Sequence, residues 1–127
     1  MRVLSEEFLA HDAHRELPAL TRGFDGRIRW IVDGAPDGKI RVITTFEAGR
    51  VKSVQLGNDA QAELTLTIRY PDLIGLLRND IDLNALFIAG DLKTDGPTGP
   101  LLDLIVAVRS EPGQAVLRTL SEAVTET

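Results

Sequence analysis

The chain has 127 residues, a formal net charge of −5 and no cysteine. A chain of this length can build one domain and bury a core without disulfide bonds. The lack of cysteine excludes disulfides, thiolate zinc sites and cysteine nucleophiles, and it suits the reducing cytoplasm. With 14 basic against 19 acidic residues and only 5% aromatic residues, the composition gives no reason to bind nucleic acid. We expect a single cytoplasmic domain over residues 1–127.

No apolar run approaches the roughly 20 residues that a membrane-spanning helix needs, so we expect no integral membrane association. The first predicted element is an amphipathic helix over residues 4–17. Ser5 and the two glutamates after it are typical of a helix start. Pro18 is expected to stop or kink this helix.

From residue 27 onwards, apolar and polar residues alternate with the period of a β-strand. In the segment RIRWIV, for example, Ile28, Trp30 and Val32 share one face. Short turns rich in glycine separate the alternating segments. This order predicts an antiparallel meander with one apolar face, built from strands over residues 27–32, 39–47, 51–57 and 62–69.

The rest of the chain is predicted to be mostly helical. Pro71 is well placed to begin one helix, and Asp82 and Gly90 to cap and end a second. Glycine and proline then bound a short segment that we expect to be a fifth strand. The expected elements are helices over residues 71–79, 82–90, 100–109 and 113–124, with the strand over residues 91–96. The apolar run of residues 100–109 alone also allows a strand, and we favour a helix because the run follows Pro100.

Residues 80–91 carry oxygen-bearing side chains with the spacing of a calcium loop. Such a loop needs a glycine at its sixth position and a glutamate at its twelfth, where this chain has Ala85 and Asp91. It would also expose the bulky apolar residues between them. We therefore interpret the spacing as a short helix that Asp82 caps, with the side chains of residues 86–88 buried.

The order of motifs around this helix is more informative than any one of them. An alternating strand with two threonines runs into an Asp-Leu helix, and a Leu-Phe-x-x-Gly element then leads into a Leu-Lys strand ending at glycine. This order resembles the sterol carrier protein type two family. The matching residues are Leu64, Thr65, Leu66, Thr67, Asp72, Leu73, Leu86, Phe87, Gly90, Leu92, Lys93 and Gly96. The chain departs from the family at residues 78–80, where a glycine is frequent, and at Asp91, where a lysine is usual.

The resemblance implies an α/β (α+β) domain with a five-stranded, mainly antiparallel sheet, covered on one face by helices that enclose an apolar tunnel. It also implies a lipid carrier, with neither catalysis nor a cofactor, that holds a fatty acid, an acyl-CoA or a sterol. Burial of an acyl chain stabilises such a complex by about 0.8 kcal/mol per CH₂ group. The candidate lipid-binding residues, each of which also suits an ordinary core, are Phe46, Leu66, Ile68, Leu73, Leu76, Leu77, Phe87, Ile88, Leu101, Leu102, Ile105, Leu117 and Leu120.

Two other classes of function compete with the carrier. Domains resembling this one are appended to bacterial alkyl sulfatases, acetyltransferases and mycothiol-dependent isomerases, where they support oligomers or shape a neighbouring active site. A chain of this kind could act likewise, as a homodimer or with a partner enzyme, through an exposed apolar patch. An enzyme in its own right has the least support, because no serine lies in a G-x-S-x-G motif and no histidine has an identifiable partner.

Three polar patterns remain. The basic residues of the first two strands share a polar face, which we interpret as solvated, with an anionic headgroup or partner surface as the alternative. The two histidines lie three residues apart without further ligands, so we expect no metal site. The GPTG segment is interpreted as a turn rather than a phosphate-binding loop. The residues concerned are Arg27, Arg29, Lys39, Arg41, His11, His14 and residues 96–99.

Overall fold

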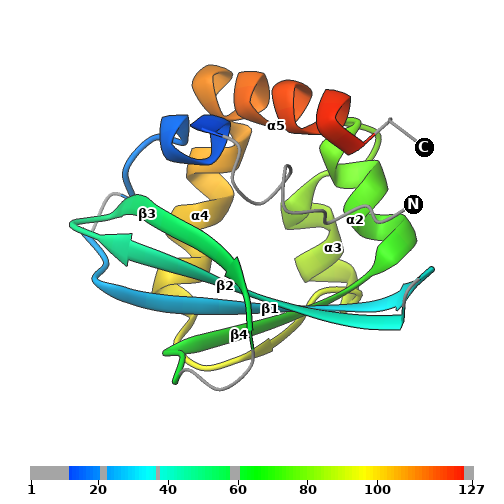
Figure 1. Cartoon of the computed structure of the whole chain (residues 1–127), viewed down its shortest axis with the longest axis horizontal. Coiled ribbons are helices and arrows are strands. Elements are labelled where there is room, and N and C mark those ends of the chain that lie inside the picture. Colours follow the sequence, from blue (N-terminus) through cyan, green and yellow to red (C-terminus); the bar gives the residue numbers. More distant parts are fainter. Residues whose placement is uncertain (1–11, 21–22, 37, 58–60, 125–127) are drawn as a thin grey trace.

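The fold is one mixed β-sheet with its helices gathered on a single face (Figure 1). The computed structural model describes residues 12–20, 23–36, 38–57 and 61–124. Within them the sheet has five strands in the order β3-β2-β1-β4-β5, and three of its four pairings are antiparallel. This arrangement confirms the predicted fold class. The strands are β1 (Gly26–Ala35), β2 (Gly38–Glu47), β3 (Arg50–Leu56), β4 (Leu64–Arg69) and β5 (Lys93–Asp95).

The helices follow the predicted order closely. They are the 3₁₀ helix η1 (Asp12–Glu16) and the α-helices α2 (Tyr70–Leu77), α3 (Leu83–Ala89), α4 (Thr98–Arg109) and α5 (Glu111–Val124). Of the helix predicted over residues 4–17, the structure describes only residues 12–17, in which η1 ends two residues before Pro18. The GPTG segment is only partly a turn, because Thr98 and Gly99 already belong to α4.

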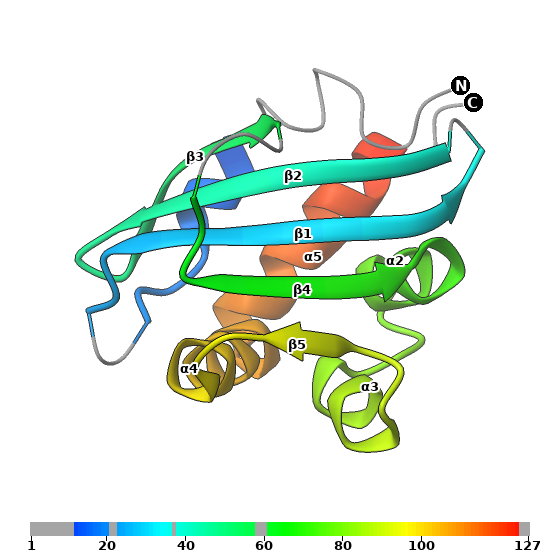
Figure 2. The ribbon, with the colours of Figure 1, turned by 90° about the horizontal axis from the view of Figure 1, so that it is seen from below.

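The predicted four-strand meander is wrong at its last strand. Strands β1, β2 and β3 form antiparallel hairpins, but β4 pairs with β1 in parallel instead of following β3. The chain therefore crosses the sheet between β3 and β4, on the face without helices (Figure 2). Burial explains this arrangement, because β4 lies between β1 and β5, where Leu64, Leu66 and Ile68 are fully buried.

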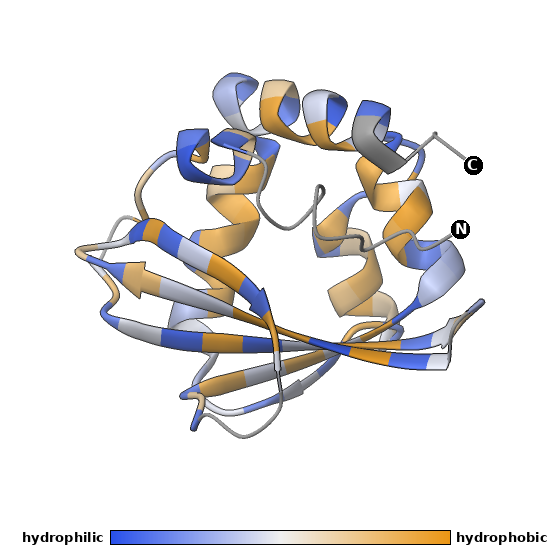
Figure 3. Cartoon of the chain, in the orientation of Figure 1, coloured by the Kyte–Doolittle hydropathy of each residue, from blue (hydrophilic) through white to orange (hydrophobic). Residues whose placement is uncertain are grey.

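The core lies between the sheet and the helices. Alternation in the strands turns one side chain in two toward the helices, and Figure 3 shows the apolar bands that result along β1, β2 and β4. Leu101, Leu104 and Ile105 of α4 and Leu117 and Leu120 of α5 are buried against this face or against one another. The apolar periodicity of the sequence thus explains which face of each element is covered.

Helix α3 forms as the calcium-loop argument predicted, with one exception. The carboxylate of Asp82 accepts a hydrogen bond from the backbone N–H of Ala85 at 3.3 Å, and Gly90 ends the helix in the left-handed conformation. Leu86 is buried and Phe87 is partly buried, whereas Ile88 is 75% exposed. The expectation that Ile88 is buried was wrong. A surface helix such as α3 packs only one of its sides against the core, and Ile88 lies on the other side.

Candidate functional site

An apolar cavity of about 160 Å³ lies between the helix-covered face of the sheet and the helices. Strands β1, β2 and β3 supply its floor, while α2, α3, α4 and α5 supply the wall opposite. Nearly all the side chains around it are aliphatic or aromatic. Such a wall offers dispersion contacts and dehydration to an apolar ligand.

Six of the residues predicted to bind lipid line this cavity. One comes from the sheet, three from α2 and two from α5, and they are Phe46, Leu73, Leu76, Leu77, Leu117 and Leu120. They lie far apart in the sequence, and the fold brings them around one space. Their role in binding a lipid stays a prediction.

The other predicted residues lie away from this cavity. Leu66 and Ile68 on β4, and Leu101 and Ile105 on α4, are buried in the core but do not line the cavity. Phe87 is partly buried against the core, and Leu102 is 43% exposed on α4. Ile88 faces outward from α3.

Several residues that line the cavity were not predicted from the sequence. They are Leu17, Trp30, Val32, Val42, Val51, Val54, Leu83, Leu104, Val108 and Val116, together with the polar residues His14 and Thr44. Strand parity could have identified part of this set, because Trp30 and Val32 share a face with the core residue Ile28. For the helix residues no comparable signal exists, since every apolar position of an amphipathic helix is an equal candidate.

Two hydrogen-bonding side chains stand out in the apolar lining. Thr44 is buried on β2, and His14 belongs to η1, which packs against β3 and α5. The indole of Trp30 faces the same space. The polar groups of the lining are therefore few and stand among apolar side chains.

Neither a metal centre nor a membrane span is found in the part of the chain that the structure describes. It contains no group of three or more histidine, cysteine, aspartate or glutamate residues able to hold a metal ion, and His11 lies outside it. No helix within the same residues combines the length and the apolar character that crossing a bilayer requires.

Comparison with known proteins identifies the family. The profile of the SCP-2 sterol transfer family matches residues 6–108, which include the sheet and the helices from η1 to nearly the end of α4. The chain belongs to the SCP-2 sterol transfer family. Membership supports lipid binding or lipid transfer as the general class of function. No protein with a curated description matches the chain significantly.

Solved structures agree with the SCP-2 fold. A conserved hypothetical protein from Thermus thermophilus, described as possibly a sterol carrier protein, has a TM-score of 0.68 at 15% identity, over 92% of this chain and 88% of that one. Palmitated SCP2L2 from Aedes aegypti has a TM-score of 0.66 at 14% identity, over 84% of this chain and 96% of that one. The sec-alkylsulfatase Pisa1 from Pseudomonas sp. has a TM-score of 0.51 at 22% identity, over 69% of this chain but 14% of its own. At these identities the likeness concerns the fold alone.

Proposed function

We propose that the protein is a cytoplasmic lipid carrier that holds a fatty acid, an acyl-CoA or a sterol between its sheet and its helices. The observation that carries this proposal is the apolar cavity, whose lining combines strands from one half of the chain with helices from the other. Membership of the SCP-2 sterol transfer family supports it. The proposal assigns the protein no catalytic step, since binding and release are sufficient for a carrier.

The size of the cavity limits what it holds in this conformation. At about 160 Å³ it is close to an engineered protein cavity of about 150 Å³ that takes up benzene. A long acyl chain or a sterol needs several times this space, so the helices have to separate from the sheet into a tunnel. Helix α5 suits this movement, because it packs mainly on η1, α2 and α4 rather than on the strands.

An acyl chain is the ligand that this opening favours. Its flexible chain can enter stepwise, and each CH₂ group that leaves water contributes about 0.8 kcal/mol toward the cost of separating the helices. The palmitated state of the Aedes aegypti relative supports the same choice. Competition of palmitate, palmitoyl-CoA and cholesterol for one site would rank the three ligands.

Trp30 provides a direct assay of ligand entry. It is the single tryptophan of the chain and it lines the cavity. We therefore expect palmitate to change the intrinsic fluorescence in a saturable way. Val108→Phe, which fills part of the cavity from α4, is expected to weaken palmitate binding by about tenfold or more, as a loss of about two buried CH₂ groups would.

Val106→Phe is the matched control for this experiment. It makes the same change two residues earlier on α4, at a position that is 63% exposed and does not line the cavity. Its palmitate affinity is expected to equal that of the unaltered protein. Equal affinities for Val108→Phe and Val106→Phe would contradict binding in this cavity.

An interaction module is the second candidate, and one observation favours it. Leu102 and Val106 lie one turn apart on the same face of α4 and are both substantially exposed. Such a pair suits a contact with a second copy or with a partner enzyme. A homodimer seen by light scattering at micromolar concentration, and lost in the variant with Leu102→Lys and Val106→Lys, would support this reading. A monomer that is unchanged by these substitutions would contradict self-association.

A further inference from the structure

The face of the sheet without helices carries an open groove that the proposed carrier function does not use. Its volume is about 330 Å³, and β1, β2, β3 and the start of the β3–β4 connection line it. Most of the lining side chains are polar, in contrast to the cavity on the opposite face. Ile43, only 6% exposed although it points away from the helices, lies in the lining.

The register of the strands aligns the polar groups of this groove. Arg27, Thr45 and Ser53 face one another across β1, β2 and β3 as one transverse row. Gln55 stands opposite Ile43 in the next row. Lys52 is the extra residue of the β-bulge between these strands, and the bulge places its side chain in the groove lining as well. One guanidinium, one ammonium, two hydroxyls and one amide thus surround the same space.

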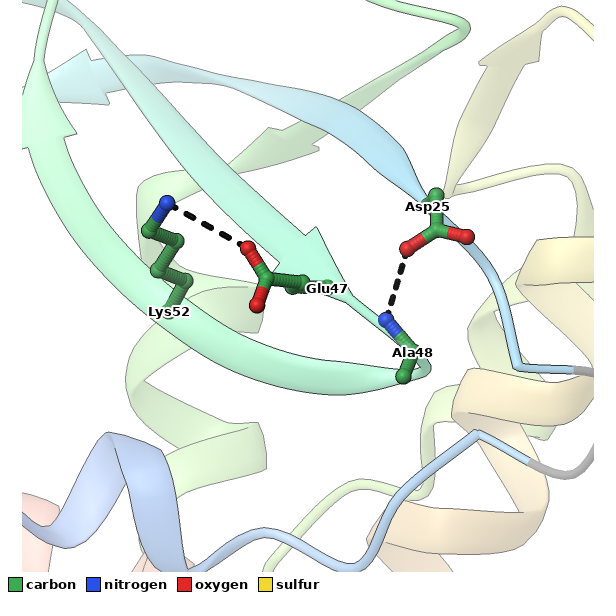
Figure 4. A network of polar contacts seen from close by, with 4 residues as sticks. All are labelled: Asp25, Glu47, Ala48 and Lys52. Carbon is green, nitrogen blue, oxygen red and sulfur yellow. Dashed lines mark hydrogen bonds and ion pairs between the residues drawn. The ribbon is translucent and has the colours of Figure 1, made fainter.

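The charged side chains that line this groove are both basic, Arg27 and Lys52. Although the protein carries a net charge of −5, the guanidinium of Arg27 has no carboxylate partner among the described residues, and the same holds for Arg41, which lies four residues from Thr45 along β2 and outside the groove lining. Lys52 does have one, Glu47, at 3.3 Å, but both side chains are exposed (Figure 4). An exposed pair of this kind is weak, so an incoming anion can compete for the lysine.

Two other carboxylates lie near Arg27 along the chain or across the sheet. That of Asp25 accepts a hydrogen bond from the backbone N–H of Ala48 in the β2–β3 turn, and that of Glu63 lies on the β4 side of β1. Glu63 accepts a hydrogen bond from the backbone N–H of Arg27 at 2.7 Å, and its own N–H donates to the carbonyl of Arg27. Both bonds lie along the edge of β1 that pairs with β4, whereas the groove lies toward β2 and β3. Glu63 therefore fixes the backbone of Arg27 and does not occupy the groove.

We propose that this groove binds the phosphate group of a small soluble molecule. An arginine that donates several hydrogen bonds in one plane, flanked by hydroxyls and a lysine, is the set of donors that recognises a phosphate monoester. The volume of about 330 Å³ leaves room for a small organic group beside the phosphate, and Ile43 offers that group an apolar surface. The proposal concerns the face opposite the cavity and stands whether or not the protein carries lipids.

Titration with inorganic phosphate, followed by ¹H–¹⁵N NMR of the labelled full chain, tests this site. Sodium chloride of matched ionic strength serves as the reference for screening. We expect saturable shifts of the backbone amide signals of Thr45, Ser53 and Gln55. Arg27→Gln should raise the phosphate Kd about tenfold, since it removes a charge-assisted contact, and Arg118→Gln, an equal charge change on the exposed side of α5, should leave it unaltered.

Three results would overturn the proposal. One is the absence of any saturable shift with phosphate, and another is an equal loss of affinity in Arg27→Gln and Arg118→Gln, which would mark a general charge effect. The third concerns the source of the phosphate. Vesicles of phosphatidylcholine with phosphatidic acid that shift the same signals, when inorganic phosphate does not, would place the phosphate on a lipid surface instead of a soluble molecule.

Discussion

Two consecutive residues turn the chain between β2 and β3, and both adopt left-handed backbone conformations. Ala48 has a φ of 51° and Gly49 a φ of 81°. The carboxylate of Asp25 accepts a hydrogen bond from the N–H of Ala48 at 2.7 Å and helps to hold this turn (Figure 4). Gly49 also packs closely, since a Cβ atom there would lie 2.6 Å from the carbonyl oxygen of Leu20. The turn therefore places β3 against the segment that follows η1.

These two positions should respond to substitution in opposite directions. Ala48→Gly removes the strain of a left-handed alanine and is expected to raise the free energy of unfolding by about 0.5–1 kcal/mol. Gly49→Ala adds both strain and a collision with Leu20, so a loss of more than about 1 kcal/mol is expected. Urea denaturation of both variants measures the difference. A stabilising Gly49→Ala would show that the turn is not built as described.

At the scale of elements, helix α3 carries one residue, Leu86, that we expect to stabilise the fold, and another, Ile88, that we expect to contribute little. Leu86 is 4% exposed and Ile88 is 75% exposed on the same helix. Leu86→Ala should cost about 2–5 kcal/mol through lost burial and the cavity that it leaves. Ile88→Ala should change stability by less than about 0.5 kcal/mol. The midpoints of urea denaturation check both values, and similar costs for the two variants would contradict this orientation of α3.

Asp91, which stands where the family usually has a lysine, forms an ion pair with a residue of another element. Arg69, at the end of β4, contacts the carboxylate of Asp72 on α2 at 3.0 Å and that of Asp91 at 3.6 Å. The aspartate that replaces the usual lysine thus faces an arginine. This small network joins the end of β4 to α2 and to the connection before β5, next to the wall of the cavity.

Local periodicity predicted the elements well, but it did not predict how β4 pairs. Alternation in residues 64–69 identified a strand, and the turn residues identified the two hairpins before it. The parallel pairing of β4 with β1 depends on a connection that crosses the sheet, and no local pattern specifies such a crossing. What selects it is the burial of Leu64, Leu66 and Ile68 in the interior of the sheet, a property of the whole fold.

The candidate site was predictable to the same limited extent. On α4, Leu104 and Val108 lie one turn apart and both line the cavity. Leu101 and Ile105 also lie one turn apart, on a neighbouring stripe of the helix, but they are buried elsewhere in the core. The two stripes differ by about 100° of rotation around the helix. Because both stripes are apolar, the sequence identifies the buried side of α4. It does not show which of the two stripes faces the cavity.

At the scale of the whole molecule, the sheet separates two environments. Its helix-covered face holds the apolar cavity, and its open face holds the polar groove with Arg27. A ligand in the cavity requires the helices to move, whereas one in the groove requires little change in the sheet. Lipid binding in the cavity therefore requires a conformational change, whereas phosphate binding in the groove does not. Either proposal can be wrong while the other is right.

The central claim is that the space between sheet and helices carries a lipid. Native mass spectrometry of the protein purified without delipidation, followed by extraction and identification of bound lipids, tests this claim most directly. We predict a population heavier than the bare chain by the mass of a fatty acid, an acyl-CoA or a sterol, and we predict that Val108→Phe reduces it while Val106→Phe does not. A bare mass that stays unchanged when palmitate, palmitoyl-CoA and cholesterol are added would contradict the carrier function.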